Sequence, residues 1–312
     1  MVTTAELPFI TKTLIPRQRD LIVRRGRILE PMLARVDKKV QVVYAPAGYG
    51  KTALLTQFAD ETELPICWYS FSPEDHDPVS ILRYCVYSIR ALYPDFGASC
   101  IFLLKSGSNV DLHTLAGLFI TELHSNVSGR LVYVFDDVHW TDGKADLEEA
   151  LSLLIERAPP NVHFIIGSRT WPTLPCLAKL TSQDELDSID ADDLRFSAEE
   201  TEQLLANIWN RPVNADEVDD AQERTGGWAA AIILLAKSQG PAGVSSHMRA
   251  SDQGVLFDYL THEVFALLPE SLQTFLLRAS VIREFTSEMC DNILEISDSG
   301  RHLQELKARG LF

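Results

Sequence analysis

The sequence lacks several features that mark secreted, membrane-bound or nucleic-acid-binding chains. Its 312 residues include five cysteines, none of them in a Cys-x-x-Cys pair. Their mostly apolar neighbours predict reduced, buried thiols instead of a disulfide framework. No apolar run approaches the roughly 18 residues that a membrane helix needs. No cationic-plus-apolar signal opens the chain, so we expect a cytoplasmic protein with no membrane partner.

Basic charge is also scarce. Lysine and arginine number 28 against 44 aspartate and glutamate residues, which gives a formal net charge of −16. Such a surface repels phosphate backbones and anionic lipids, so we expect no DNA contact from this segment itself. With 46% hydrophobic residues, the chain is long enough for two or three cores.

One glycine is missing from the stretch that organises the chain. The apolar run Val40–Tyr44 leads into Ala45-Pro-Ala-Gly-Tyr-Gly-Lys-Thr52, which has Walker A spacing except that Ala45 replaces the first glycine. In this pattern, backbone N–H groups at a helix N-terminus converge on phosphate oxygens. Lys51 is expected to reach the β- and γ-phosphates, and the Thr52 hydroxyl to bind Mg²⁺.

The sequence therefore predicts an ATP or ADP site with Mg²⁺ at this loop. The alternative is a chance glycine-rich turn, which the preceding strand and the following helical run 53–59 argue against. The predicted loop contacts are Ala47, Gly48, Tyr49, Gly50, Lys51, Thr52 and Ala53.

The second motif is the apolar run Leu131–Phe135, which ends in Asp136 and Asp137. An apolar strand ending in an acid is typical of Walker B. We expect the first carboxylate to support Mg²⁺ and the second to orient or activate water. Two acids that merely end a strand are the alternative, which the βα alternation after a P-loop disfavours. His139 follows, and we interpret it as a hydrogen-bonded structural histidine.

Two further segments carry candidate site residues. Val162–Ile166 is a predicted strand that ends before Arg169. In P-loop proteins with an extra strand between the Walker strands, this tip points at the γ-phosphate, so we expect Arg169 to sense it; a surface salt bridge is the alternative. In the arginine-rich N-terminal arm, Val23 and Arg25 are expected to pack over the base or the phosphates, unless the arm is simply solvated.

The order of elements predicts an α/β P-loop NTPase fold. Alternating helices and strands up to residue 166 indicate a parallel sheet with helices on both faces. Ser197–Glu200 has the pattern of a capping box that opens a helical domain. The step Thr225–Ala229 is either a close helix crossing that glycine permits or a contact to the nucleotide. The expected parts are an arm at 1–30, a nucleotide-binding domain at 31–190, a helical domain at 191–240 and a linker near 239–253, followed by further helices that begin with one at 255–268.

Together these motifs resemble the STAND class of signal-transduction ATPases, and more narrowly the N-terminal part of the MalT-like, large ATP-binding regulators of the LuxR family. The resemblance rests on Lys12–Arg27, Ala47–Thr52, Trp68–Ser70 with Asp75 and Asp77, Phe135–His139, Leu194–Ser197 and Thr225–Trp228.

The resemblance implies that ADP holds a closed monomer, and that inducer and ATP favour an open form that self-associates. It implies that residues 254–312 are the start of a winged-helix domain that closes over bound nucleotide. It also implies that an inducer and promoter DNA bind through regions beyond this chain. Two departures matter: Ala45 replaces a glycine, and Ala229 stands where many members have a proline against the adenine. The sequence leaves open whether Ala229 or His302 contacts nucleotide, and it names no inducer or promoter.

We therefore expect a slow, regulatory ATPase that acts as the switch module of a transcriptional regulator, with Lys51, Asp136, Asp137 and Arg169 as catalytic residues. A P-loop phosphotransferase acting on a small molecule is the alternative, although the helical C-terminal half offers no recognisable acceptor pocket. A non-hydrolysing scaffold is the third candidate.

Overall fold

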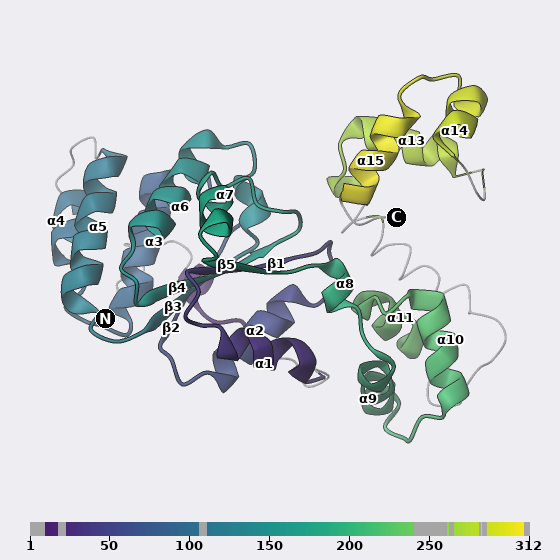
Figure 1. The fold of residues 1–312 in the computed structure, drawn as a ribbon, viewed down its shortest axis with the longest axis horizontal. Coiled ribbons are helices and arrows are strands. Elements are labelled where there is room, and N and C mark those ends of the chain that lie inside the picture. Colours follow the sequence, from purple (N-terminus) through teal and green to yellow (C-terminus); the bar gives the residue numbers. More distant parts are fainter. Residues whose placement is uncertain are drawn as a thin grey trace. The chain divides into compact units, whose positions relative to one another are not determined.

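The computed structural model describes residues 10–17, 23–105, 111–239, 261, 265–280, 282 and 286–308. The chain divides into two compact units (Figure 1). The first unit contains the chain up to Tyr44 and the segment Lys51–Asp193. The second unit contains the loop Ala45–Gly50 and the chain from Leu194 onward.

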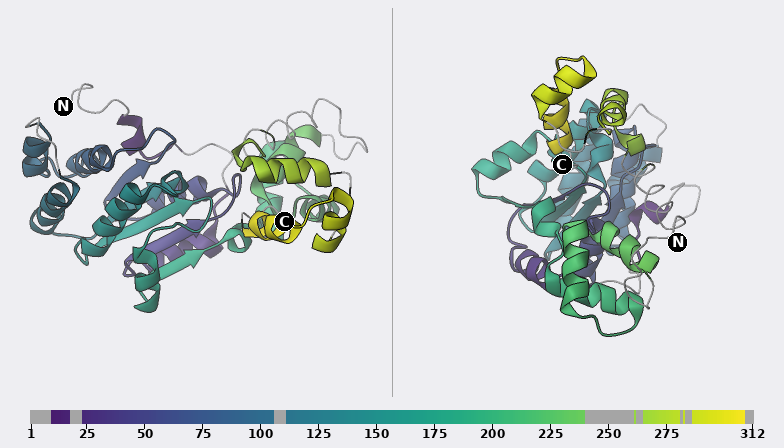
Figure 2. Two further views of the ribbon diagram at one scale, coloured as in Figure 1. Left: turned by 90° about the horizontal axis from the view of Figure 1, so that it is seen from above. Right: turned by 90° about the vertical axis from the view of Figure 1, so that its right-hand side faces the viewer.

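The first unit is built on a parallel sheet of five strands in the order β2-β3-β4-β1-β5. Figure 2 shows the strand arrows running in one direction. Strand β4 lies between β1 and β3, because Ile166 pairs with Val42 on one side and with Phe135 on the other. The predicted strand between the two Walker strands is thereby confirmed. The strands are β1 Val40–Tyr44, β2 Ile66–Ser70, β3 Leu131–Asp136, β4 Val162–Ser168 and β5 Leu186–Ile189.

Helices cover both faces of this sheet, as the sequence predicts. Figure 1 shows α1 and α2 on one face and α3, α5, α6 and α7 on the other. Helices α4 and α7 were not predicted from the sequence. The bounds are α1 Gly26–Ala34, α2 Lys51–Glu61, α3 Pro78–Arg90, α4 Ala98–Lys105, α5 Leu112–Asn126, α6 Ala145–Arg157, α7 Cys176–Ser182 and α8 Ala191–Leu194, with 3₁₀ turns η1 Ile10–Thr13 and η2 Val138–Thr141.

Local signals explain where α3 begins and how the N-terminal arm is held. Asp77 caps α3 by accepting from Val79 N (3.1 Å) and Ser80 N (3.0 Å), and Pro78 occupies the first helical turn. In the arm, Lys12 Nζ lies 2.8 Å from Asp75 Oδ1. The segment Asp75–Asp77 therefore both leads into α3 and anchors η1.

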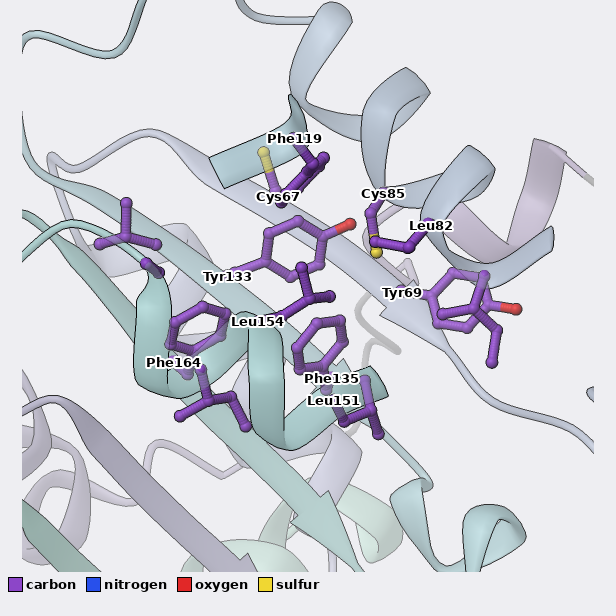
Figure 3. Packing of buried hydrophobic residues seen from close by; sticks show 14 of the residues in the cluster. Cys67, Tyr69, Leu82, Cys85, Phe119, Tyr133, Phe135, Leu151, Leu154 and Phe164 are labelled. Atoms are coloured by element: carbon purple, nitrogen blue, oxygen red, sulfur yellow. The ribbon is translucent and has the colours of Figure 1, made fainter. Parts of the chain in front are cut away.

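Aromatic side chains form the centre of the core between the sheet and the helices α3 and α6 (Figure 3). The ring of Phe135 lies 4.6 Å from the ring of Tyr133 and 5.8 Å from that of Phe164, measured between centroids. Cys67 and Cys85 pack into the same cluster, and all five cysteines are free and buried, as predicted. Because Phe135 is packed in this core, the end of β3 is held in place where the Walker B acids follow.

Helices α9 Ala198–Trp209, α10 Ala215–Thr225 and α11 Ala229–Gln239 form the first part of the second unit. The capping box at Ser197 and Glu200 is confirmed, since each side chain bonds to the other residue's backbone N–H. Trp209 Nε1 donates to Ala236 O at 2.8 Å, which ties α9 to α11. The helical interpretation of this segment is therefore correct.

A separate hydrophobic cluster lies in the C-terminal segment. It joins Leu272 and Phe275 of α13 to Cys290 of α14 and Leu306 of α15. The expected linker after Gln239, most of the helix predicted from Val255 and the apolar end at 309–312 lie outside the described residues. The elements are η4 Phe265–Leu267, α13 Glu270–Ala279, α14 Ser287–Leu294 and α15 Ser299–Ala308. Among the helices described, none has the length and hydropathy to span a membrane.

Candidate functional site

The structure joins the two Walker motifs of the first unit through a hydrogen bond. Lys51 and Thr52 start helix α2, and Asp136 ends β3. Thr52 Oγ1 donates to Asp136 Oδ2 at 2.8 Å. A hydroxyl and a carboxylate are the hard oxygen donors that Mg²⁺ takes beside phosphate oxygens, so this pair fits Mg²⁺.

Gly167 of β4 keeps space open beside the Asp136 carboxylate. A Cβ atom at this position would lie 2.5 Å from Asp136 Oδ1 and 3.0 Å from Leu55 Cδ1. Real Cβ atoms essentially never approach other atoms to 2.5 Å, so any larger residue would displace the carboxylate. Gly167, which lies between the predicted strand Val162–Ile166 and Arg169, therefore has a steric role.

Burial raises the pKa of Asp136 and lowers the pKa of Lys51. Asp136 is 2% exposed, and burial, followed by the charge of Asp137, raises its pKa to about 6. Burial lowers the pKa of Lys51 to about 8; the charges of Asp137 and Asp136 oppose this shift, and Arg169 adds to it. The four predicted catalytic residues are thus close enough to influence one another electrostatically.

Asp137 has an unusual backbone and an accessible side chain. Its φ of 57° and ψ of 37° lie in the left-handed region, which few residues other than glycine adopt. Its N–H donates to Asp136 Oδ1 at 3.0 Å, and its side chain is 39% exposed. The backbone turn therefore directs the second acid toward solvent, where it can meet water.

His139 is a largely buried neighbour of the cluster, with its side chain 11% exposed, and the sequence did not assign it to the site. Within the described residues, neither ring nitrogen has a hydrogen-bond partner, so the prediction of a hydrogen-bonded structural histidine was wrong. Its Nδ1 lies 3.7 Å from Asp137 Oδ1. Burial, with the positive charges of Arg169 and Lys51, lowers its pKa to about 3, so the imidazole is neutral. In the sequence, the one sign that His139 lies beside the site is its position two residues after Asp137.

The loop Ala45–Gly50 shows why the missing glycine is tolerated. Gly48 and Gly50 have φ values of 81° and 83°, and a side chain at either position would be strained. Ala45 does not belong to the residues with positive φ, and it is 1% exposed. Alanine is therefore compatible with the backbone at the first position of the pattern.

Val23 and Arg25 are hydrogen-bonded through their backbones to α2, the helix that follows the loop. Both are 4% exposed. Gln57 of α2 accepts from the Arg25 N–H at 3.0 Å and donates to Val23 O at 2.9 Å. The arm segment thus lies against α2, and its contact with the base stays a prediction.

The Gly-Gly-Trp-Ala step makes a close crossing in the second unit. A Cβ atom on Gly227 would lie 2.8 Å from Phe196 O, so glycine is required there. Trp228 also contacts the loop, because its Nε1 donates to Ala47 O at 3.1 Å.

His302 lies in the C-terminal cluster, with its ring 5.1 Å from that of Phe275. Direct nucleotide contacts of Ala229 and His302 stay predictions.

Comparisons with known proteins identify chains of similar sequence and similar fold. A family model described as the MalT winged helix domain matches residues 261–312. The HTH-type transcriptional regulator MalT of Yersinia pestis (strain Pestoides F) is 29% identical over 299 residues, which cover 93% of this chain and 32% of the regulator. MalT of Yersinia enterocolitica is also 29% identical, over 301 residues with the same coverage. A Walker-type ATPase structure from Pyrococcus abyssi has a TM-score of 0.66 at 14% identity and covers 94% of this chain and 92% of that chain.

The comparisons confirm the resemblance to MalT-like regulators. The Pyrococcus structure confirms the P-loop ATPase fold, and the family model confirms the winged-helix assignment at the C-terminal end. The chain spans about a third of the length of the curated relatives it matches.

Proposed function

We propose that this chain, which is similar to MalT regulators over most of its length, is an ATP- and ADP-binding switch module that hydrolyses ATP slowly. The observation that carries the proposal is the 2.8 Å hydrogen bond from Thr52 to Asp136, with Lys51 buried beside both Walker acids. This arrangement suits Mg²⁺ and phosphate, which supply the electrostatic chemistry of phosphoryl transfer.

Each residue has a proposed role. Thr52 and Asp136 hold Mg²⁺, and Lys51 supplies a positive charge to the phosphates. Asp137 accepts a proton from water or orients it, and Arg169 distinguishes ATP from ADP by pairing with the additional charge. The remaining proposed nucleotide contacts are Val23, Arg25, Ala47, Gly48, Tyr49, Gly50 and Ala53.

Occupancy, more than turnover, is proposed to carry the signal. A nucleotide that binds one of two conformations 100-fold more tightly favours that conformation by about 2.7 kcal/mol when both are saturated. Slow hydrolysis by Asp137 then limits how long the ATP-bound form persists. The proposed parts are an arm at 1–30, a nucleotide-binding domain at 31–190, a helical domain at 191–240 and a winged-helix domain at 254–312.

The proposed binding partners of this protein follow from its similarity to the MalT regulators. We infer that an inducer and ATP favour self-association, and that DNA is bound by a domain outside these residues. The printed name of the relatives, HTH-type transcriptional regulator, supports that division, as does the net charge of −16 on this chain.

The test is nucleotide binding by the Lys51→Ala variant, measured by isothermal titration calorimetry with ADP and with ATP. We expect the wild-type chain to bind both nucleotides and the variant to lose at least about tenfold in affinity, because a buried cation opposite the phosphates is removed. Wild-type protein that binds neither nucleotide would overturn the proposal.

Lys39 provides a matched control. It is also a partly buried lysine of the first unit, with a pKa lowered to about 8 by burial, but its Nζ donates to Ala158 O and Pro159 O. Lys39→Ala should therefore lower the melting temperature without changing nucleotide affinity. Equal loss of binding in both variants would mean that affinity follows folding and not the P-loop charge.

A further inference from the structure

We infer that helix α11 presets the phosphate-binding amides of the P-loop through Trp228 and Ala230. Trp228 Nε1 donates to Ala47 O at 3.1 Å, and Ala230 N donates to Gly48 O at 3.0 Å. Both contacts lie inside the second unit, which contains the loop and α11. The inference rests on the proposed nucleotide binding and assigns a positioning role to two residues that the Walker pattern does not include.

Peptide geometry connects these carbonyl contacts to the phosphate side of the loop. A trans peptide is planar, so the C=O of one residue and the N–H of the next point in opposite directions. With Ala47 O held by Trp228, the Gly48 N–H points away from α11. With Gly48 O held by Ala230, the Tyr49 N–H does the same. Two successive donors of the loop are thus oriented before an anion arrives.

The start of α11 is suited to this task. The first N–H groups of a helix have no partner within the helix, so the Ala230 amide is free to donate to a neighbouring carbonyl. The Trp228 side chain adds a second donor, and its ring lies 6.4 Å from the ring of Tyr49. The two hydrogen bonds and the ring contact therefore fall on three consecutive loop residues, Ala47, Gly48 and Tyr49.

The two glycines place Trp228 at the loop. Phe196 N donates to Gly227 O at 2.8 Å, and Arg195 Nη1 donates to Gly226 O at 2.7 Å. Gly226 is a left-handed cap of α10 with φ 57°. The close crossing at Gly227 and the contact of Trp228 with the loop are thus two parts of one arrangement.

The decisive variant is Trp228→Phe, which keeps an aromatic ring and removes the N–H donor. Its matched control is Trp209→Phe, which removes the indole bond to Ala236 O at 2.8 Å in the same unit. For each protein the dissociation constants of ADP and of adenosine are measured by calorimetry, together with the melting temperature.

We expect Trp228→Phe to weaken ADP binding by roughly two- to tenfold, the range that one hydrogen bond is worth, and to leave adenosine binding unchanged. Trp209→Phe should lower the melting temperature and leave both constants unchanged. An unchanged ADP constant in Trp228→Phe, or equal losses for ADP and adenosine, would overturn the inference. Wild-type protein that binds no ADP would instead refute the proposed function on which the inference rests.

A second variant keeps the test decisive if Trp228→Phe is less stable than Trp209→Phe. Ala230→Pro removes the amide that donates to Gly48 O, and proline is tolerated in the first turn of a helix. We expect the same selective loss of ADP affinity. A folded Ala230→Pro protein with wild-type ADP affinity would contradict the role assigned to α11.

Discussion

The hydroxyl of Thr52 donates a hydrogen bond to the carboxylate of Asp136 across 2.8 Å, although the two residues lie 84 positions apart in the sequence. This contact joins the start of α2 to the end of β3 on the same edge of the sheet. It is the contact in which both Walker motifs meet.

Removal of the Thr52 hydroxyl should weaken the metal-dependent part of nucleotide binding. Thr52→Val keeps the side-chain shape but removes one proposed Mg²⁺ ligand and the bond to Asp136. We expect ADP affinity in Mg²⁺ to fall roughly tenfold or more, and affinity in EDTA to change little. Thr56→Val is the control, because Thr56 is a buried threonine of the same helix that bonds only to Ala53 O in the described structure. Equal effects of both variants would exclude a metal role for Thr52.

Protonation of Asp136 should make Mg²⁺ binding depend on pH. Its raised pKa of about 6, against 3.8 for the ordinary group, means that the metal-free native state holds its proton to higher pH than the unfolded chain does. The metal-free protein should therefore lose stability as pH rises from about 4 through about 6. Mg²⁺ competes with this proton, so stabilisation by Mg²⁺ should grow over the same interval.

Thermal unfolding with Mg²⁺ and with EDTA, measured at a series of pH values, checks this expectation. Asp136→Asn should abolish the dependence because the amide does not titrate. Stabilisation by Mg²⁺ that is the same at about pH 5 and about pH 7.5 would show that Asp136 does not control the site.

Asp137→Asn should separate hydrolysis from binding. The amide has a similar shape but cannot accept a proton from water, so we expect ATP hydrolysis to fall by roughly 10²- to 10⁴-fold. Affinity for ADP should stay within about threefold, since the side chain is 39% exposed and directed to solvent. Phosphate release and calorimetry measure the two effects. Hydrolysis that is unchanged in Asp137→Asn would contradict the proposed role of Asp137, and unchanged assembly as well would favour the scaffold alternative.

Gly167→Ala should destabilise the first unit and also displace Asp136 from its hydrogen bond with Thr52. The added Cβ would meet Asp136 Oδ1 at 2.5 Å, so the carboxylate or the strand must shift, at an expected cost of about 1–3 kcal/mol. Gly117→Ala in α5 is the control: nothing lies within 4 Å of its Cβ, and alanine favours a helix by up to about 1 kcal/mol. Chemical denaturation should give opposite signs for the two variants. A Gly167→Ala protein of wild-type stability would contradict the observed packing.

Local signals predicted much of this fold. Apolar runs before the Walker motifs became β1 and β3, and the Ser197–Glu200 box starts α9 as expected, because each signal lies within a few residues. Helix α4 was missed because its sequence, Ala98–Lys105, is apolar on all sides and lacks a helical period. The N-terminal N–H groups of α4 are capped by a residue that is distant in the sequence: Glu122 of α5 accepts from the Ser99 N–H at 2.9 Å.

In the candidate site, too, the sequence predicted what local motifs determine and missed contacts between distant segments. Sequence spacing predicted that Lys51 and Asp136 belong to one site, since both lie in patterned motifs, and the structure brings them close together. The bond from Trp228 to Ala47 connects residues 181 positions apart, and the burial of His139 depends on packing around η2. Neither could be inferred from spacing, because both result from how distant segments pack.

The measurement that tests the central claim most directly is the identity of the nucleotide released when the purified protein is denatured. The supernatant would be separated by ion-exchange chromatography against ADP and ATP standards, with Lys51→Ala protein prepared in parallel. The account predicts tightly held ADP in the wild-type protein and little or none in the variant. A wild-type site that is empty after purification, binds ATP weakly and turns it over rapidly would contradict the switch and indicate an ordinary enzyme.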